Sequence, residues 1–197
     1  MASEFDERFR AAIDRIDAAN ADDLHRVSHD GREIAAEVLY ARRMTAWLER
    51  LYPDASEQLR LAVRAQHIRR WEIPRNTYPM DRAGYQRWRT ALYTFHADTA
   101  ERILREVGYD DATIARVRSL LRKERLKSDP ETQALEDVAC LVFLESYFAE
   151  FAAKHDDEKL ITILRRTWAK MSPKARDAAL ALKLEPRARA LIENALA

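Results

Sequence analysis

The chain has 197 residues, of which 47% are hydrophobic and 34% are charged, and this balance predicts a single globular domain with a core of its own. It contains only three glycines, which argues against an all-β protein rich in tight turns. The net charge of +1 argues against a protein that binds nucleic acid or a membrane surface through bulk electrostatics.

A hydrophobic period of 3.6 residues runs through nearly every segment, and no segment shows the alternation typical of a strand. We therefore expect one all-α domain over residues 1–197, built from about eight helices. In chain order the expected helices span residues 3–19, 32–51, from 54 through His67, 81–107, 111–124, 129–153 and 157–171, with two short helices that begin near Ser172 and Glu185.

Capping residues and prolines set these boundaries. The signals are Ser3 and Asp54 as N-caps (Asp54 with Glu57 in the capping-box position), Pro53 as a stop, Asp81 and Asp129 as N-caps of two long helices, and Gly108 as a terminator. Pro74 and Pro79 predict an irregular segment over residues 72–80. The stretch with His25, His29 and Gly31 is expected to be a polar connection.

The cysteine content and the apolar runs predict a cytoplasmic protein with no membrane segment. The single cysteine, Cys140, cannot form an intramolecular disulfide and indicates a reducing compartment. Residues 1–20 lack the apolar stretch of a signal peptide. The longest apolar run, residues 138–144, is too short to span a bilayer.

Five ionisable residues are placed where the predicted helices face the core. His67 follows Leu59 and Val63 on one stripe, and His96 follows Leu92 on another. The carboxylates in such positions are Glu37, Glu136 and Asp137. Imidazole with carboxylate is a ligand set that suits zinc, iron or manganese, so these residues form a candidate metal site. The alternative is that each is a hydrogen-bonded or ion-paired core residue.

A second cluster, rich in arginine and aromatic residues, occupies residues 69–89 between the two histidines. Arginine binds phosphate and carboxylate groups in bidentate geometry, so this cluster is a candidate site for an anionic small molecule. The candidate binding residues are Arg70, Arg75, Tyr78, Arg82 and Arg89, with Lys123 from a later basic segment. The alternative is that the arginines pair with the many carboxylates of the chain and that the tryptophans belong to the core.

Several stretches of the chain resemble known helical proteins. "AQHI", "FHADTAERILREVGYDDATIARVRSLLRKE" and "DPETQALEDVACLVFLE" follow one another as in the HD phosphohydrolase superfamily. "QHIRRWEIPRNTYPMDRAGYQRWR", "LEDVACLVFLE" and "WAKMSP" resemble an uncharacterised family of bacterial and fungal proteins. The resemblance covers about residues 33–182 and implies an HD-like orthogonal helical bundle with a divalent metal held by histidine and aspartate side chains.

The chain departs from the HD pattern at two ligand positions. The His-Asp pair falls at His67 and Ile68, and the first histidine falls near Glu37. Two functions follow. The first is a metal-dependent hydrolase or oxygenase that acts on an anionic, phosphorylated or nucleotide-like small molecule. The second is a non-catalytic domain that binds a ligand or a protein through residues 69–89. Nucleic acid is a weaker candidate partner, and the sequence specifies no oligomeric state.

Overall fold

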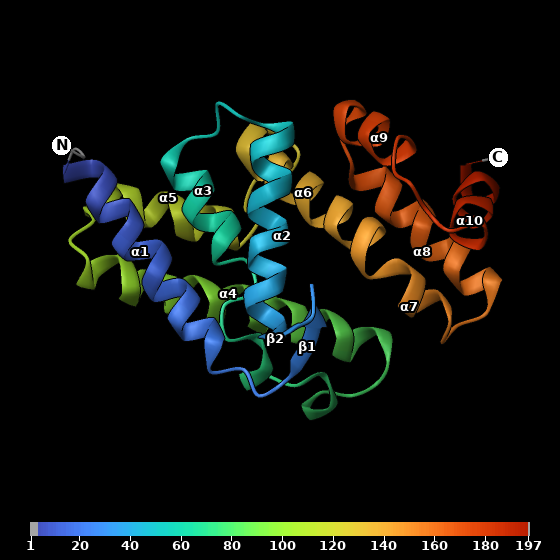
Figure 1. Cartoon of the computed structure of the whole chain (residues 1–197), viewed down its shortest axis with the longest axis horizontal. Coiled ribbons are helices and arrows are strands. Elements are labelled where there is room, and N and C mark those ends of the chain that lie inside the picture. The colour runs from blue at the N-terminus through green and yellow to red at the C-terminus, as the bar shows by residue number, and fades with distance from the viewer. Residues whose placement is uncertain (1–3, 197) are drawn as a thin grey trace.

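The structure is a computed structural model that describes residues 4–196, with side chains from residue 7 onward (Figure 1). Its α-helices are α1 (Glu4–Ala21), α2 (Ala36–Leu51), α3 (Glu57–Arg64), α4 (Arg82–Glu106), α5 (Asp111–Leu121), α6 (Pro130–Ser146), α7 (Phe148–Ala152), α8 (Asp157–Lys170), α9 (Pro173–Leu180) and α10 (Pro186–Leu196). Strands β1 (Arg26–His29) and β2 (Arg32–Ala35) and the 3₁₀ turns η1 (Arg70–Glu72) and η2 (Arg75–Thr77) complete the elements. The predicted all-α class is confirmed.

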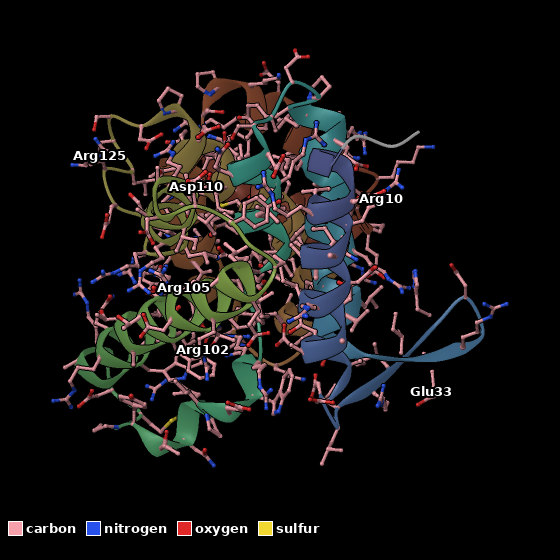
Figure 2. All side chains as sticks on the ribbon, turned by 90° about the vertical axis from the view of Figure 1, so that its left-hand side faces the viewer. Arg10, Glu33, Arg102, Arg105, Asp110 and Arg125 are labelled. Atoms are coloured by element: carbon pink, nitrogen blue, oxygen red, sulfur yellow. The ribbon has the colours of Figure 1, made fainter. Side chains whose placement is uncertain are left out.

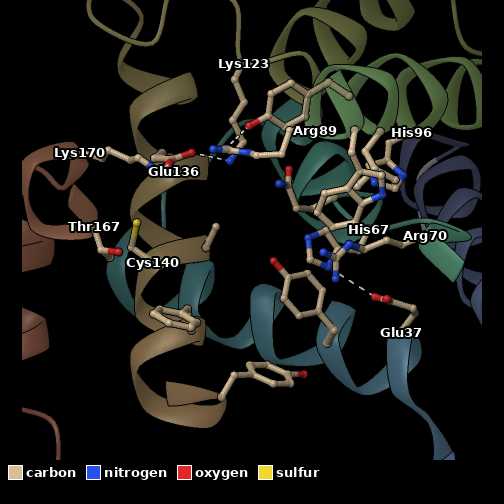
Figure 3. Close-up of a pocket in the computed structure, with 18 of the residues that line it drawn as sticks. Glu37, His67, Arg70, Arg89, His96, Lys123, Glu136, Cys140, Thr167 and Lys170 are labelled. Atoms are coloured by element: carbon tan, nitrogen blue, oxygen red, sulfur yellow. Dashed lines mark hydrogen bonds and ion pairs between the residues drawn. The ribbon is translucent and has the colours of Figure 1, made fainter. Parts of the chain in front are cut away.

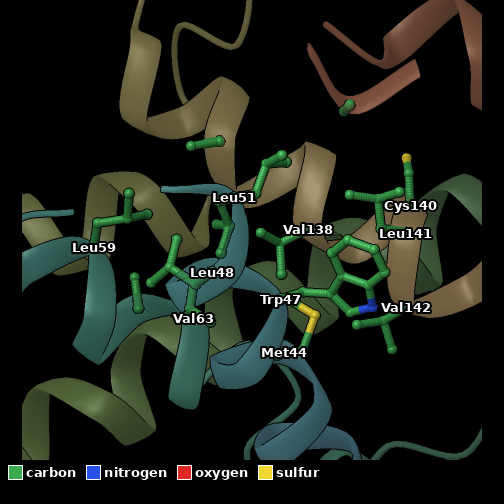
Figure 4. Packing of buried hydrophobic residues seen from close by; sticks show 14 of the residues in the cluster. Met44, Trp47, Leu48, Leu51, Leu59, Val63, Val138, Cys140, Leu141 and Val142 are labelled. Carbon is green, nitrogen blue, oxygen red and sulfur yellow. The ribbon is translucent and has the colours of Figure 1, made fainter. Parts of the chain in front are cut away.

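Helices α2 and α6 lie at the centre of the molecule, with α1, α3 and α5 to one side and α7 to α10 to the other (Figure 1). Met44 and Leu48 of α2 are buried together with Val63 of α3 and with Val138 and Leu141 of α6 (Figure 4). The same hydrophobic cluster contains residues from α1 to α10. The central part of α6 is buried nearly all round, which is why its sequence is apolar on every face.

Several predicted caps are confirmed. The side chain of Asp81 accepts a hydrogen bond from the Gly84 amide at the start of α4, and that of Asp129 caps α6 ahead of Pro130. Ser56, and not Asp54, caps α3, so that helix begins two residues later than a cap at Asp54 would place it. Ser3, the expected cap of the first helix, lies outside the described residues.

The polar connection expected around His25 and Gly31 is a β-hairpin instead, and residues 32–35 are its second strand and not the start of α2. Asp30 and Gly31 both have positive φ, of 51° and 72°. Two such residues form the tight turn that matches the twist of paired strands. The hairpin carries Glu33 and extends away from the helices (Figure 2). Arg10, labelled in the same view, lies on α1.

Three predicted helices also end early. Helix α3 stops at Arg64, so His67 lies in the turn that follows and not on the helix itself. Helix α5 stops at Leu121, because Lys123 and Arg125 adopt left-handed backbone angles. The long helix expected to run to residue 153 is interrupted at Tyr147 and continues as α7. Among residues 4–196, no helix is both long enough and apolar enough to cross a membrane.

Candidate functional site

A cavity of about 600 Å³ lies between α2, the turn after α3, α4 and the helices α6 to α8 (Figure 3). We call it the central pocket. The residues that line it are Ala36, Glu37, Tyr40, Gln66, His67, Arg70, Tyr85, Trp88, Arg89, Leu92, Tyr93, His96, Lys123, Glu136, Ala139, Cys140, Phe143, Tyr147, Phe151, Thr167 and Lys170. Its size falls within the range of small-molecule sites.

Glu37 and His67 meet on one side of the central pocket (Figure 3). His67 Nδ1 lies 3.5 Å from Glu37 Oε2, and the imidazole stacks on the Tyr40 ring with 3.9 Å between ring centroids. Burial raises the pKa of Glu37 to about 7, although the Arg70 guanidinium works to lower it. Burial also holds the pKa of His67 well below its usual value. Near neutral pH the His67 imidazole is therefore neutral, and the Glu37 carboxyl group is about half protonated.

His96 lies beside His67, with 6.0 Å between the two ring centroids. Its Nδ1 is 2.9 Å from the carbonyl oxygen of Ile68, so Nδ1 must carry the proton and donate it. Burial, with His67 as a second cause, lowers the pKa of His96 to about 3. The imidazole is therefore neutral, and within the described part of the chain its buried Nε2 has no hydrogen-bond partner.

Arg70 and Arg89 bring two guanidinium groups to the pocket, where their charges act on Glu37 and Glu136 respectively. The guanidinium carbon of Arg70 lies 5.0 Å from the centre of the Trp88 ring, and the Nε of Arg70 is buried without a hydrogen-bond partner among residues 4–196. Arg89 donates a hydrogen bond to the hydroxyl of Tyr93 and lies over the rings of Tyr85 and Tyr93. In the described residues neither guanidinium forms an ion pair with a carboxylate.

Lys123, Glu136 and Lys170 form a buried charge cluster on another wall of the pocket (Figure 3). Lys123 Nζ donates to Glu136 Oε2, and both side chains are less than 10% exposed. Lys170 Nζ lies 3.5 Å from the other carboxylate oxygen. Burial works to raise the pKa of Glu136, but Lys123, with Lys170 and Arg89, holds it at about 2. Glu136 is therefore fully ionised and its charge is compensated.

Asp137, the neighbour of Glu136, points away from the central pocket. Its carboxylate accepts hydrogen bonds from the amide and hydroxyl of Ser172, from the Tyr52 hydroxyl at 2.6 Å and from the Gln133 amide at 2.9 Å. Asp137 thus joins α6 to the start of α9. Of the two adjacent carboxylates, the structure gives the pocket position to Glu136.

The other predicted binding residues divide in the same way. Arg70, Arg89 and Lys123 line the central pocket, whereas Arg75, Tyr78 and Arg82 do not. Arg75 donates to the carbonyl oxygens of Tyr78 at 3.0 Å and of Pro79 at 2.7 Å, so it holds the irregular segment before α4 in shape. Arg82 is exposed at the first turn of α4.

The five predicted metal ligands fall into three groups: Glu37 with His67 and the nearby His96, Glu136 with its lysines, and Asp137 with Ser172. Over residues 4–196, no group of three or more His, Cys, Asp or Glu side chains is arranged to hold a metal ion. Metal binding by these residues stays a prediction.

Sequence reasoning missed several residues of the pocket. Lys170 and Thr167 come from α8, and Gln66 and Tyr40 from segments near His67 and Glu37. Tyr40 lies three residues after Glu37, so helical spacing could have identified it. Gln66 directly precedes His67. No local signal links α8 to the pocket, because that contact depends on how the last helices pack.

The fold and the pocket together define an all-helical protein with a ligand-sized cavity between its central helices. The model of a domain of unknown function, DUF4202, matches residues 10–192, and the chain belongs to this family. The expected resemblance to an uncharacterised family is thereby confirmed. Comparison with curated proteins gives no match, and comparison with solved structures gives none either.

Proposed function

We propose that this protein binds a small anionic molecule, such as one with a phosphate or carboxylate group, in the central pocket. The observation that carries the proposal is that Arg70 and Arg89 line the cavity without a carboxylate partner in the described residues. Both guanidinium groups are half-buried and lie beyond ion-pair distance of Glu37 and Glu136 in the described residues, so an anionic ligand would supply the direct charge-assisted contact that they lack.

The charge balance of the pocket supports an anion. Four cationic side chains (Arg70, Arg89, Lys123 and Lys170) face two carboxyl groups (Glu37 and Glu136), which leaves +2 when both carboxyls are ionised and +3 when Glu37 is protonated. The whole chain has a net charge of only +1. The excess of positive charge is thus concentrated where a ligand would bind. Because the cavity walls have a low dielectric constant, they strengthen the electric field of these charges.

The backbone at Lys123 explains how this side chain reaches the pocket. Lys123 has a φ of 54°, a left-handed conformation that costs energy for a residue with a side chain. This conformation ends α5 and directs the ammonium group to Glu136 in the pocket wall. The amides of Lys123 and Glu124 donate to the carbonyl oxygens of Leu120 and Ser119, the hydrogen bonds of a common helix end, so the cationic side chain is held in place by local structure.

Isothermal titration calorimetry with pyrophosphate, a small polyanion, tests the proposal. We expect binding to the wild-type protein and at least tenfold weaker binding by Arg70→Gln and by Arg89→Gln, because each loses a charge-assisted contact. Arg10→Gln, an exposed arginine on α1, is the matched control and is expected to bind as the wild type does. Equal affinity of the wild type and the three variants for pyrophosphate would overturn the proposal. So would a wild-type protein that binds none of pyrophosphate, phenyl phosphate and benzoate.

A second candidate function, acid–base catalysis on the bound anion, is supported by the Glu37–His67 pair. A carboxyl group with a pKa of about 7 can both donate and accept a proton near neutral pH, which is the requirement for a general acid or base. The test is incubation of a cellular small-molecule extract with the wild type and with Glu37→Gln. Conversion of an anionic compound by the wild type alone supports catalysis, and identical metabolite profiles contradict it.

A divalent metal, as the HD resemblance implies, would extend this second candidate. The neutral Nε2 of His96 is a suitable donor, but the positive charge of Arg70 next to Glu37 and His67 opposes a cation, so the arrangement fits an anion better. Iron, manganese and zinc can be measured in protein purified without chelator. One equivalent of metal in the wild type that is absent from both His67→Ala and His96→Ala would support a metal site. Trace metal that is the same in the wild type and both variants would contradict it.

A further inference from the structure

One face of α6 crosses the central pocket from a charged end to an apolar end. Ala139, Cys140 and Phe143 follow Glu136 by three, four and seven residues, and all four line the cavity, so they share one helix face. Glu136 lies near Lys123, Lys170 and Arg89, whereas Phe143 lies seven residues further along. Seven residues of helix correspond to about 10 Å, the length of an aromatic ring with an attached anionic group.

Beyond Glu136, two side chains of this wall, Cys140 and Thr167, offer the cavity only weakly polar groups. The hydroxyl of Thr167, from α8, donates to the Ile163 carbonyl oxygen of its own helix at 3.0 Å. Burial raises the pKa of the Cys140 thiol to about 12, so it stays neutral and behaves as an apolar group. Cys140 and Thr167 lie together on one side of the cavity, opposite Glu37 and His96 (Figure 3).

Aromatic rings provide most of the remaining wall at this end. Phe143 and Phe151 meet edge to face, with 5.8 Å between centroids and 71° between ring planes. Both rings, and that of Tyr147, are only partly buried although they pack against the core. Partly uncovered rings inside a concave cavity gain from a flat aromatic guest, since rings prefer stacked and edge-to-face neighbours.

We propose that the anion bound in the central pocket is an aromatic one, with its ring against Phe143 and Phe151 and its phosphate or carboxylate group beside Arg89 and Lys123. The inference rests on the proposed function and adds the chemical class of the ligand. An inorganic or strongly polar anion would leave the apolar half of the cavity filled only with water. A neutral aromatic compound would leave the arginines without a counter-ion.

The experiment is calorimetric titration with matched probes. Phenyl phosphate and benzoate combine a ring with an anion, butyl phosphate replaces the ring by an alkyl chain, and inorganic phosphate and benzyl alcohol each lack one part. We expect phenyl phosphate to bind at least about tenfold more tightly than inorganic phosphate, and more tightly than butyl phosphate and benzyl alcohol. Benzoate shows whether carboxylate serves as well as phosphate.

Filling the apolar half separates this inference from the proposed function. Ala139→Trp places a large side chain in the path of the ring, so the ratio of the phenyl phosphate affinity to the inorganic phosphate affinity is expected to fall to about one. Ala149→Trp, at an exposed position of α7, is the matched control. If Ala139→Trp does not unfold cooperatively, Phe151→Ala takes its place, and the same ratio of affinities is expected to fall.

Equal affinity of the wild type for phenyl phosphate and inorganic phosphate, or for phenyl and butyl phosphate, would overturn the aromatic class and leave anion binding intact. An unchanged ring advantage in both Ala139→Trp and Phe151→Ala would overturn the position of the ring. Absence of binding by every anion, pyrophosphate included, would instead refute the proposed function. The two failures are therefore distinguishable.

Discussion

Glu37 has a buried carboxyl group whose protonation should control part of the stability of the protein. Its pKa rises from 4.5 to about 7 on folding because the group is buried. The folded state therefore holds a proton that the unfolded state releases between these two pH values, so the stabilisation is complete below pH 4.5 and is lost as the pH rises to about 7. The difference corresponds to at most about 3 kcal/mol.

Glu37→Gln removes this titration and tests it. We expect the free energy of unfolding of the variant, relative to the wild type, to increase by roughly 1–3 kcal/mol between pH 4 and pH 8, measured by urea denaturation. His67 and His96 act in the opposite direction, because their lowered pKa values cost stability as the pH falls below 6.5. Both proteins keep the histidines, so the comparison cancels their own burial and leaves the titration of Glu37 together with the effect of its charge on His96. A difference that does not vary with pH would contradict the prediction.

Lys123 and Glu136 form a buried ion pair. Removing only the lysine should lower the free energy of unfolding, whereas removing both partners should not. Lys123→Met keeps the length of the side chain but leaves the Glu136 carboxylate in the protein interior with a weaker partner, Lys170, at 3.5 Å. Breaking such a pair costs about 3 kcal/mol or more, whereas replacing both partners by apolar residues is often close to neutral. We therefore expect Lys123→Met to be strongly destabilised in urea denaturation.

The double variant Lys123→Met/Glu136→Leu is the control for this prediction. It removes the carboxylate that the single variant leaves uncompensated, so most of the lost stability should return. A double variant less stable than the single one would show that the pair stabilises the fold itself.

At the scale of the elements, local signals predicted boundaries well where a side chain acts on its own helix. Asp81, Asp129 and Gly108 mark helix ends in the sequence and in the structure. The hairpin was missed although Asp30-Gly31 is a typical two-residue turn, because its strands are short and polar and give no hydrophobic alternation. The break between α6 and α7 at Tyr147 contains no glycine or proline, so the sequence did not predict it.

The irregular segment before α4 is held against that helix at Gly84. A β-carbon built at Gly84 would lie 2.0 Å from the carbonyl oxygen of Pro79, which is far too close for backbone that cannot move freely. The same segment is fixed by Arg75 and by a 2.8 Å hydrogen bond from Trp88 Nε1 to the Ile73 carbonyl oxygen. Close approach, and not conformational freedom, is thus the reason for glycine inside α4.

Gly84→Ala should therefore destabilise the protein, although alanine is the better helix former by about 1 kcal/mol. We expect a lower melting temperature and faster hydrogen exchange over residues 73–81, because the segment must move away from α4 to relieve the clash. Arg87→Ala, at an exposed position on the same helix, should change neither. A melting temperature of Gly84→Ala at or above that of the wild type would contradict this packing.

At the scale of the whole molecule, the central pocket is assembled from segments that are distant in sequence. Glu37 and Lys170 lie 133 positions apart, yet both line the same cavity. Residue type and helical spacing identified Glu37, His67, His96, Arg70, Arg89, Lys123 and Glu136 as candidates. They did not show that α8 would contribute Lys170, or that Asp137 would face Ser172, because both depend on the packing of the last helices against α6.

This assembly predicts how an anion should act on the protein as a whole. A ligand that contacts Arg70 and Lys170 at once links the helices on either side of α6, so the backbone around both should open less often when the pocket is occupied. With saturating pyrophosphate, hydrogen exchange is expected to slow together in residues 66–70, 85–96 and 167–170. The hairpin over residues 26–35 is the internal control and should exchange at an unchanged rate. Protection restricted to one of the three segments would mean that the anion binds one wall of the pocket and does not bridge it.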